Sequence, residues 1–329
     1  MADSLNETSV PISESRDETE KFDAIVIGSG VTGLYALYRM RQLGFSVRAF
    51  DDASGVGGTW YWNRYPGCRF DSESYSYGYS FSEELLQEWD WKEHYSSQPE
   101  TERYLNYVAD KFDLRRDIQF NSRVMSATFV EEDSCWEIVL KDGSKARGQY
   151  LITSVGSFSA GYVPDFEGID SFKGITSHTR GWPAEGIDLA GKRVGVIGTG
   201  ASGVQLITEI AKEVDHLTVF QRTANYCAPL RNGPIDDETQ KQIKASYPEI
   251  FRVCMETPGS FMHEFDKRSA MNVSKEERLE QYERLWAEPG FKKWLSNFHD
   301  VMVPGEANED YAEFVRNKIR ERVHDPAIA

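Results

Sequence analysis

The chain contains two similar stretches in which a short apolar run is followed by glycines and then by an amphipathic segment. The first apolar run, Phe22–Ile27, is continuous, which is typical of a strand buried on both faces of a parallel sheet. Leu34, Leu37 and Met40 then recur at helical spacing, and Ser46–Phe50 predicts a second strand. The order of these segments predicts a strand–helix–strand unit near the amino terminus.

The second stretch repeats this order further along the chain. Arg193–Ile197 predicts a strand, and Leu217–Phe220 predicts the strand that follows. Between them, Val204, Ile207 and Ile210 predict one face of a helix. Two such units predict an α/β chain with two Rossmann-like, doubly wound domains of three layers each.

A hairpin and a linker are predicted between the two units. The segment CWEIVLKDGSKARGQYLITSVG predicts a β-hairpin that turns at Asp142 and Gly143, followed by a strand over Tyr150–Ser154. Gly156 and Pro164 then mark a linker.

The last hundred or so residues have a helical pattern without catalytic motifs. Ser274 and Glu277 predict a capping box, and Leu279, Tyr282 and Leu285 are expected on the buried face of the helix that follows. Asn308 is expected to cap a terminal helix. The apolar face of that helix is predicted to consist of Tyr311, Val315, Ile319 and Val323.

Composition restricts the possible partners. The 329 residues carry a formal net charge of -16, which argues against a nucleic-acid partner because phosphates repel an acidic surface. No apolar run approaches the roughly 20 residues that cross a bilayer, so we expect no membrane association and a cytoplasmic location. Residues 1–20 are polar and lack the pattern of a secretory signal, which predicts a disordered leader. The sequence leaves the oligomeric state open.

The four cysteines form no CxxC pair, so neither a metal site nor a redox disulfide is predicted. This spacing also argues against a flavin disulfide reductase, which needs two close cysteines beside its flavin. The cysteines are Cys68, Cys135, Cys227 and Cys254.

The glycines of the first unit follow the pattern GxGxxG at Gly28, Gly30 and Gly33. Such glycines let the backbone turn tightly and approach a pyrophosphate, which the N-terminus of the following helix stabilises. Thr32 lies inside this turn, and Asp51 ends the second strand, where a carboxylate accepts hydrogen bonds from a ribose hydroxyl. Together these residues predict a dinucleotide site for an unphosphorylated ribose.

The second unit repeats the glycine pattern but has Gln221 in place of the acid at the end of its second strand. The next residue, Arg222, has a guanidinium that can bind a ribose 2′-phosphate, which a carboxylate would repel. The contrast predicts NADPH rather than NADH; the alternative interpretation is an arginine merely exposed at a strand end. The other residues expected to contact this nucleotide are Gly198, Thr199, Gly200, Ala201, Ser202, Gly203, Gln205 and Thr223.

Two sites with different ribose preferences predict FAD in the first unit and NADPH in the second, and hence an oxidoreductase in which nicotinamide reduces flavin. The FAD-binding domain is expected at residues 21–156 and a linker at 157–183. The NADP-binding domain is expected at 184–329, with a helical insertion at about 235–329.

The linker contains the segment FKGITSHTRGWP, in which Phe172, Gly174, His178, Trp182 and Pro183 fit the pattern FxGxxxHxxxWP. This pattern resembles the fingerprint of type I Baeyer–Villiger monooxygenases, flavoenzymes that convert ketones to esters or lactones. The resemblance extends over nearly the whole chain after the leader, through segments such as VGGTWYWNRYPGCRFDSES, VGVIGTGASG and FVRNKIRERVHDP. The related N- and S-oxygenating flavin monooxygenases usually have Phe or Tyr in place of the Trp-Pro ending.

The resemblance implies roles for residues outside the glycine turns. Asp71 matches the family's active-site aspartate, which is paired with a mobile arginine; without the family, it would be interpreted as a loop or cap residue. His178 matches a histidine tied to movement between the two domains, although a lone histidine is more often a packing residue. The aromatic run that follows Gly58 fits a flavin wall and core packing equally well. The residues implied to approach FAD are Gly57, Gly58, Thr59, Trp60, Tyr61, Trp62, Asp71, Tyr77 and Val124.

The implied reaction uses FAD, NADPH, O2 and a ketone, and inserts one oxygen atom next to the carbonyl through a C4a-peroxyflavin. The family's active-site arginine falls beyond the final VHDPAIA, as do the returning strands of the FAD domain, so the resemblance implies a truncated chain with an incomplete FAD domain. We expect this chain alone to be poorly stable and to have little oxygenating activity. The alternatives are an N- or S-oxygenating flavin monooxygenase and a non-catalytic fragment that binds NADPH.

Overall fold

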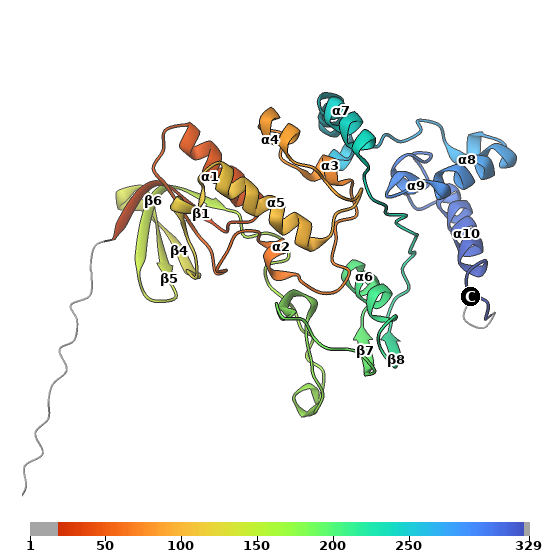
Figure 1. Cartoon of the computed structure of the whole chain (residues 1–329), viewed down its shortest axis with the longest axis horizontal. Helices are drawn as coiled ribbons and strands as arrows, with labels where there is room; N and C mark the ends of the chain where they lie inside the picture. The colour runs from red at the N-terminus through yellow and green to blue at the C-terminus, as the bar shows by residue number, and fades with distance from the viewer. Residues whose placement is uncertain (1–18, 326–329) are drawn as a thin grey trace, which may run out of the picture. The chain divides into compact units, whose positions relative to one another are not determined.

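The computed structural model describes residues 19–325, which form two compact units (Figure 1). Unit 1 consists of the chain up to Gly58 together with Ala109–Ser159. Unit 2 consists of Thr59–Val108 and the chain from Ala160 onward. Of the expected leader, residues 1–18 lie outside the described residues, and the first strand begins at Glu20.

Unit 1 is built on a mixed sheet that has, among residues 19–325, the strand order β3-β2-β1-β6-β5-β4. The strands from β3 to β6 in this order are parallel, whereas β6, β5 and β4 are antiparallel neighbours. β1 and β2 confirm the two apolar runs predicted as strands. The strands are β1 Glu20–Ile27, β2 Val47–Phe50, β3 Ile118–Gln119, β4 Val124–Val130, β5 Cys135–Leu140 and β6 Lys145–Thr153.

The predicted hairpin is present, but its second arm is longer than expected. β5 and β6 pair across the turn at Asp142 and Gly143, where the Ser144 amide donates to the Asp142 carboxylate at 3.0 Å. β6 then continues without interruption in parallel register with β1. The strand expected over Tyr150–Ser154 is confirmed as far as Thr153, but it is not separate from the hairpin. It is the second half of β6, because hydrogen bonding to β1 overlaps the hairpin pairing and keeps the strand continuous.

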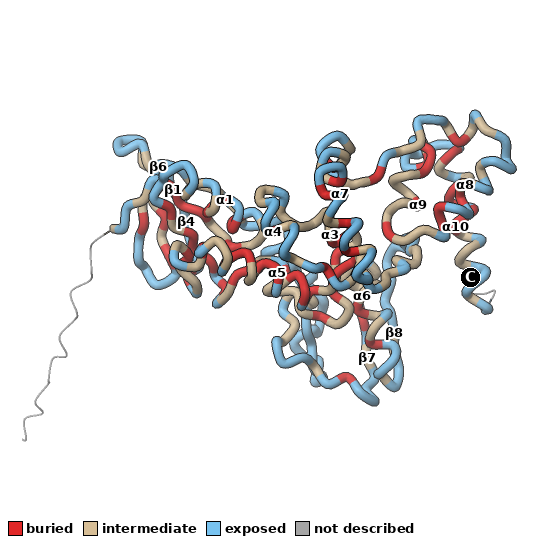
Figure 2. Tube along the Cα trace, turned by 45° about the horizontal axis from the view of Figure 1, so that its top comes forward, coloured by how far each residue is buried: buried red, intermediate tan, exposed pale blue. Residues whose placement is uncertain are grey.

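Apolar side chains on both faces of β1 form the core of unit 1. Residues 24–26 are fully buried, as expected for a strand covered on both faces, and Figure 2 shows part of β1 as buried. The helix α1, Val31–Gln42, follows β1 and buries Leu34 and Leu37, as its spacing predicted. The core cluster of the sheet consists of Ile25, Phe50, Ile138, Leu140 and Ala146.

The second predicted strand–helix–strand segment lies in unit 2. β7, Arg193–Ile197, pairs in parallel with β8, His216–Phe220, and α6, Ala201–Ile210, connects them. Within the described chain this sheet has two strands. Ile197 and Phe220 are 68% and 56% exposed, so this small sheet leaves apolar surface uncovered.

A group of helices precedes this segment in the chain. The hydroxyl of Ser82 caps one of them by accepting a hydrogen bond from the Leu85 amide at 3.2 Å. The last residues of α5 belong to unit 1, and the rest of these helices to unit 2. The helices are α2 Thr59–Trp62, α3 Ser74–Tyr77, α4 Glu83–Glu88 and α5 Gln98–Lys111.

The predicted helical region of unit 2 is confirmed. Its main core is aromatic, and Tyr282, Phe298 and Phe314 pack together there. No helix between residues 19 and 325 is both long and apolar enough to cross a lipid bilayer. The helices are α7 Asp237–Glu256, α8 Lys275–Ala287, α9 Lys292–Leu295 and α10 Glu306–Arg320.

The Ser274 half of the capping box predicted for α8 is confirmed, because its hydroxyl accepts a hydrogen bond from the Glu277 amide at 3.2 Å, while the Glu277 carboxylate pairs with Arg268. The burial expected for Leu279 is wrong, since its side chain is 42% exposed. Tyr282 and Leu285 of the predicted face are buried, together with Trp286, and Leu279 in the second turn lies outside the core cluster.

The cap predicted for the last helix is also wrong. α10 begins before Asn308, and Gly305 occupies its N-cap position. The side chain of Asn308 instead donates to the carbonyl oxygen of Val301 at 2.8 Å. Tyr311 and Val315 of the predicted apolar face are buried.

Candidate functional site

The first glycine turn connects β1 to α1 in unit 1. An ideal Cβ atom on Gly33 would lie 1.9 Å from the carbonyl oxygen of Gly28, so only glycine allows this approach of helix and strand. Gly30 occupies the N-cap of α1 and, lacking a side chain, places no capping group over the first amides. Thr32 is exposed in the first turn, which contains no acidic residue. These features fit the pyrophosphate of a dinucleotide.

A hydrogen bond joins each glycine turn to the end of the neighbouring strand. In unit 1, the amide and hydroxyl of Ser29 donate to Oδ2 of Asp51 at 2.5 and 2.6 Å, and the Ala53 amide donates to Oδ1 at 2.8 Å. In unit 2, Nε2 of Gln221 donates to the hydroxyl of Thr199 at 3.0 Å. A carboxylate has about four acceptor positions. The amide and hydroxyl of Ser29 and the amide of Ala53 use three of those on Asp51, which leaves roughly one to accept a hydrogen bond from a ribose hydroxyl. The sequence signal for this link was a hydroxyl residue after the first glycine of both motifs.

The second glycine turn has the same construction. An ideal Cβ on Gly203 would lie 2.4 Å from the carbonyl oxygen of Gly198. Gly200 is the N-cap of α6, and no described atom lies within 4 Å of an ideal Cβ placed there. Ala201 and Ser202 begin this helix of 10 residues, whose first turn contains no acidic residue. The turn is therefore open to an anion and fits a dinucleotide pyrophosphate.

Arg222 and Thr223 follow β8 and are exposed. Between residues 19 and 325, no ion pair or hydrogen bond engages the guanidinium of Arg222. The segment beyond them is held to the glycine turn, because Nδ2 of Asn225 donates to the carbonyl oxygen of Thr199 at 3.1 Å. An unpaired cation beside a dinucleotide turn fits a ribose 2′-phosphate.

Gly57 and Gly58 lie against the first glycine turn. The Gly57 amide donates to the carbonyl oxygen of Ser29 at 3.2 Å, and an ideal Cβ on Gly58 would lie 2.8 Å from Cα of Gly30. Close backbone contact within unit 1 thus explains these glycines without a ligand. Val124, at the start of β4, packs against the core cluster of the sheet. The approach of Gly57, Gly58 and Val124 to FAD stays a prediction.

Trp60 lies in an aromatic cluster of unit 2. It is buried, and its Nε1 donates to the hydroxyl of Tyr77 at 2.9 Å. Phe70 stacks on Tyr77 with ring centroids 4.3 Å apart. Core packing therefore accounts for Trp60, which was one of the two interpretations of the aromatic run.

The neighbours of Trp60 in the aromatic run are more accessible. Tyr61 and Trp62 are half-buried, and the preceding Thr59 is exposed. The guanidinium carbons of Arg64 and Arg180 lie 4.6 and 5.2 Å from the ring centroids of Tyr61 and Trp62, respectively. Cation–π contacts thus cover one side of each ring.

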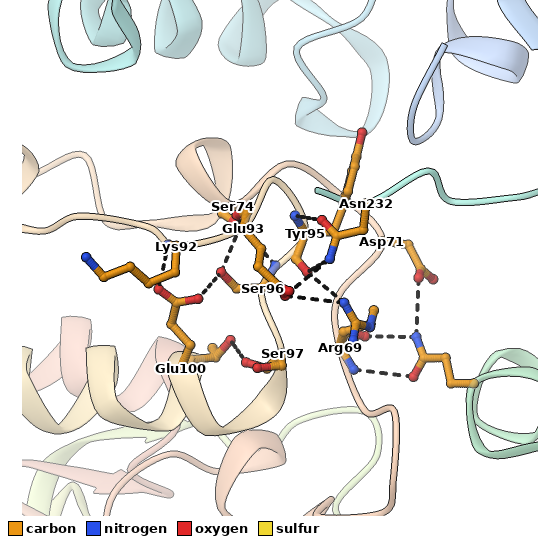
Figure 3. A network of polar contacts seen from close by, with 12 residues as sticks. Arg69, Asp71, Ser74, Lys92, Glu93, Tyr95, Ser96, Ser97, Glu100 and Asn232 are labelled. Carbon is orange, nitrogen blue, oxygen red and sulfur yellow. Dashed lines mark hydrogen bonds and ion pairs between the residues drawn. The ribbon is translucent and has the colours of Figure 1, made fainter. Parts of the chain in front are cut away.

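Asp71 is half-buried in the loop between α2 and α3. Burial raises the pKa of Asp71 above its ordinary value, against the opposing effects of a hydrogen bond from Gln205 and the charge of Arg69. Nε2 of Gln205 is 3.3 Å from Oδ1 of Asp71, and Figure 3 shows the contact as a dashed line that ends on the labelled Asp71. A carboxyl group with a perturbed pKa and a specific partner is a candidate functional group.

Arg69 is anchored away from Asp71 by a network that includes the segment after β8 (Figure 3). Its Nη1 donates to the Tyr95 carbonyl oxygen at 3.3 Å and pairs with the Glu93 carboxylate at 3.4 Å. Nδ2 of Asn232 donates to the same two acceptors, both at 3.2 Å. The loop carrying Asp71 is therefore fixed on this side by charge-assisted hydrogen bonds.

Neutral donors satisfy a second carboxylate of the network, that of the buried Glu100. The Ser96 hydroxyl and the Lys92 amide each donate to it at 2.8 Å, and the Ser96 amide donates to the Ser74 hydroxyl at 2.9 Å. These bonds link α5 to the start of α3 (Figure 3). They stabilise the scaffold behind Asp71.

His178 is exposed and acts locally as a cap. Its Nδ1 accepts a hydrogen bond from the Arg180 amide at 3.1 Å, at the start of the 3-10 turn Thr179–Gly181. His178 and Pro183 border a hollow of about 490 Å³, which residues of the fingerprint segment line together with others between Gly186 and Lys192. In unit 2 the structure thus brings Asp71 and Gln205 together, whereas the hydrogen bond of His178 stays within its own segment.

Comparison with known proteins agrees with these features. The model of the family described as flavin-binding monooxygenase-like matches residues 21–229, more than half of the chain. The chain therefore belongs to the flavin-binding monooxygenase-like family.

The chain is similar to cyclohexanone 1,2-monooxygenase of Acinetobacter sp., with 45% identity over 94% of the chain and 57% of that protein. It is also similar to the phenazine N-monooxygenase PhzNO1 of Lysobacter antibioticus, with 43% identity over 94% of the chain and 57% of that protein. A crystal structure of OTEMO in complex with FAD and NADP superimposes with a TM-score of 0.91 and 44% identity. That match covers 94% of the chain and 60% of the OTEMO chain. The chain thus spans less than two thirds of the length of these relatives.

Proposed function

We propose that the protein is an FAD- and NADPH-dependent Baeyer–Villiger monooxygenase, which inserts one oxygen atom of O2 next to a ketone carbonyl to give an ester or lactone. FAD is assigned to the glycine turn of unit 1 and NADPH to that of unit 2. The supporting observation is the contrast at the two strand ends, where Asp51 is an acid bound by Ser29 and Arg222 is an exposed cation without a partner in the described part of the chain. The first suits a bare ribose and the second a 2′-phosphate.

The predicted domain boundaries are part of this proposal. The FAD-binding domain is residues 21–156, the linker is 157–183 and the NADP-binding domain is 184–329. The proposed location is the cytoplasm.

The residues of this chain serve mainly to bind and to orient. Bound flavin would supply the chemistry that passes reducing equivalents from NADPH to O2. Arg222 and Thr223 are assigned to the 2′-phosphate, and Asp71 places a carboxylate near the reacting groups. His178 caps the turn from which Arg180 covers Trp62, which gives it a role in fixing the fingerprint segment on the aromatic run.

Oxygenation at nitrogen is a second candidate, because one of the similar proteins is a phenazine N-monooxygenase. Trp182 and Pro183 favour the Baeyer–Villiger reaction, since the N- and S-oxygenating enzymes usually have Phe or Tyr in this place. The third candidate, a non-catalytic protein that binds NADPH, requires only the open turn at Gly200 and the cation at Arg222.

The test is an assay of the full product of the natural gene with NADPH, 18O2 and cyclohexanone. We expect flavin absorption in the purified protein and a lactone that contains one 18O atom. A thioether and a phenazine are assayed in parallel. Products from these substrates without lactone would instead establish the second candidate, and NADP+ binding without flavin or any product would establish the third.

A further inference from the structure

All four hydrogen-bonding positions of the Gln205 side-chain amide are used by one loop. Oε1 accepts from the hydroxyl of Tyr65 at 2.8 Å and from the amide of Arg69 at 3.4 Å. Nε2 donates to the carbonyl oxygen of Arg69 at 2.9 Å and to Oδ1 of Asp71 at 3.3 Å. Because the oxygen faces two donors and the nitrogen faces two acceptors, the partners define the orientation of the amide.

The backbone of this loop also packs directly on α6. An ideal Cβ on Gly67 would lie 2.7 Å from the carbonyl oxygen of Gln205, and Gly67 has a φ of +82°. Both the conformation and the close contact therefore require glycine. Tyr65 and Cys68 on either side are each only 6% exposed, so the loop is seated on the helix by buried contacts.

Gln205 is consequently the link between two parts of the candidate site. It lies on α6, the helix whose N-cap is Gly200, and it reaches Asp71 in a loop distant in the sequence. Among residues 19–325, no other side chain or amide donates a hydrogen bond to the Asp71 carboxylate. The guanidinium of Arg69 is held by Glu93 and Tyr95 instead.

We propose that Gln205 is a positioning residue, and not a cofactor contact as its place in the motif predicted: its amide holds the Asp71 carboxylate at a fixed place relative to the N-terminal turn of α6. This inference deepens the proposed function and rests on it for the role of Asp71. NADPH is assigned to the turn at Gly200, so Gln205 fixes the carboxylate relative to the bound nucleotide. Displacement of Asp71 from that place would separate the charge from the reacting groups.

The hydrogen bond has an electrostatic consequence that can be measured without any cofactor. A donor to a carboxylate stabilises its ionised form, whereas burial destabilises it. Removing the donor while the carboxyl stays buried must therefore raise the pKa of Asp71. If Gln205 merely filled space, its removal would loosen the loop, admit water and lower this pKa.

The test is a 13C NMR titration of aspartate-labelled protein, with the Asp71 carboxyl signal assigned through Asp71→Asn. Gln205→Met removes the amide at similar volume, and Gln205→Asn keeps an amide that is too short to reach Asp71. Gln242→Met is the matched control, because Gln242 is an exposed helical glutamine whose amide bonds Glu238 on its own helix. Circular dichroism verifies that each variant is folded.

We expect the pKa of Asp71 to rise by about one pH unit or more in both Gln205 variants and to stay unchanged in the control. If the Met variant does not fold, the Asn variant decides. An unchanged or lowered pKa in a folded Gln205 variant would overturn the inference. Since the titration involves neither ketone nor nucleotide, its outcome is independent of whether the protein forms a lactone.

Discussion

At the scale of single residues, Asp71 combines a perturbed charge with a defined partner. Burial raises the pKa of Asp71, and the hydrogen bond from Gln205 and the charge of Arg69 offset this only in part. At neutral pH the ionised group therefore lowers the stability of the folded chain relative to an exposed aspartate. Residues that are retained at a cost in stability are commonly found at functional sites.

Asp71→Asn is expected to stabilise the chain at neutral pH. The folded-state pKa of Asp71 lies above its unfolded value of about 3.9. The protonated Asp71 side chain therefore contributes fully to stability below about pH 3.9, and this contribution is lost as the pH rises through the folded-state pKa. Asparagine stays neutral and avoids this loss. Thermal unfolding should give a higher Tm for Asp71→Asn at pH 7 to 8, and the difference from the native chain should shrink toward about pH 4.

The matched control is Asp142→Asn, which should have the opposite effect. Hydrogen bonds from Ser144 hold the pKa of the Asp142 carboxyl below its ordinary value, so its contribution is present at neutral pH and is lost as pH falls. An Asp71→Asn variant that is less stable than the native chain at pH 7 would mean that the surroundings favour the charge of Asp71.

At the scale of secondary-structure elements, the two glycine turns have the same backbone construction but different surroundings. In both, the third glycine contacts the carbonyl oxygen of the first. Gly200, in contrast, has open space at its Cβ position and an extended conformation, with φ -73° and ψ -179°, that other residues adopt freely. Folding therefore requires Gly33 and Gly203, whereas it does not require Gly200.

Gly200→Ala is expected to separate binding from stability. The variant should fold with a Tm close to that of the native chain, because among residues 19–325 no atom beyond the chain neighbours lies within 4 Å of the new methyl group. Its affinity for NADP+ should fall at least about tenfold, because the methyl group occupies the approach of the pyrophosphate. Calorimetric titration and thermal unfolding measure the two effects.

Gly33→Ala serves as the comparison, because its methyl group would lie 1.9 Å from the Gly28 carbonyl oxygen and should prevent unit 1 from folding normally. Native-like NADP+ affinity in Gly200→Ala would rule out this turn as the nucleotide site.

Local patterns predicted the elements whose own residues determine them. The apolar runs gave β1, β2, β7 and β8, and the hydroxyl of Ser274 gave the start of α8. The errors arose where a neighbouring element decides the outcome. Pairing with β1 joins Tyr150 to the hairpin strand, and packing around Tyr282 leaves Leu279 exposed.

For the candidate site too, local patterns predicted the parts that a short segment determines, but not the contacts between distant segments. Glycines at fixed spacing mark both turns, and the residues at the strand ends mark the difference between them. The contact between Asp71 and Gln205 was not predictable, because it joins a loop to a helix far along the chain and no local pattern encodes such a contact. The link from Ser29 to Asp51 and the equivalent link between Thr199 and Gln221 each join two segments about 22 residues apart, which no local pattern encodes.

At the scale of the whole molecule, the chain spans 57% of the length of each of the two enzymes reported above. The small sheet of unit 2 leaves Ile197 and Phe220 largely exposed. Exposed apolar surface forgoes roughly 25 cal/mol of stabilisation per Å². Poor stability of this chain alone stays a prediction, as does its low oxygenating activity.

The central claim is that one chain distinguishes two nucleotides by the charge at two strand ends. The most direct test compares the dissociation constants of NADP+ and NAD+ for the native chain, Arg222→Ala and the control Arg193→Ala. Arg193 is an exposed arginine at the start of β7, and Arg222 follows the end of the parallel strand β8. The control therefore removes the same charge at the other end of this sheet.

The native chain and the control should bind NADP+ at least tenfold more tightly than NAD+. Arg222→Ala should lose most of this preference through weaker NADP+ binding, by about 1.5–3 kcal/mol, which is typical of a hydrogen bond to a charged group. An Arg222→Ala variant that keeps the native preference for NADP+ would contradict the account.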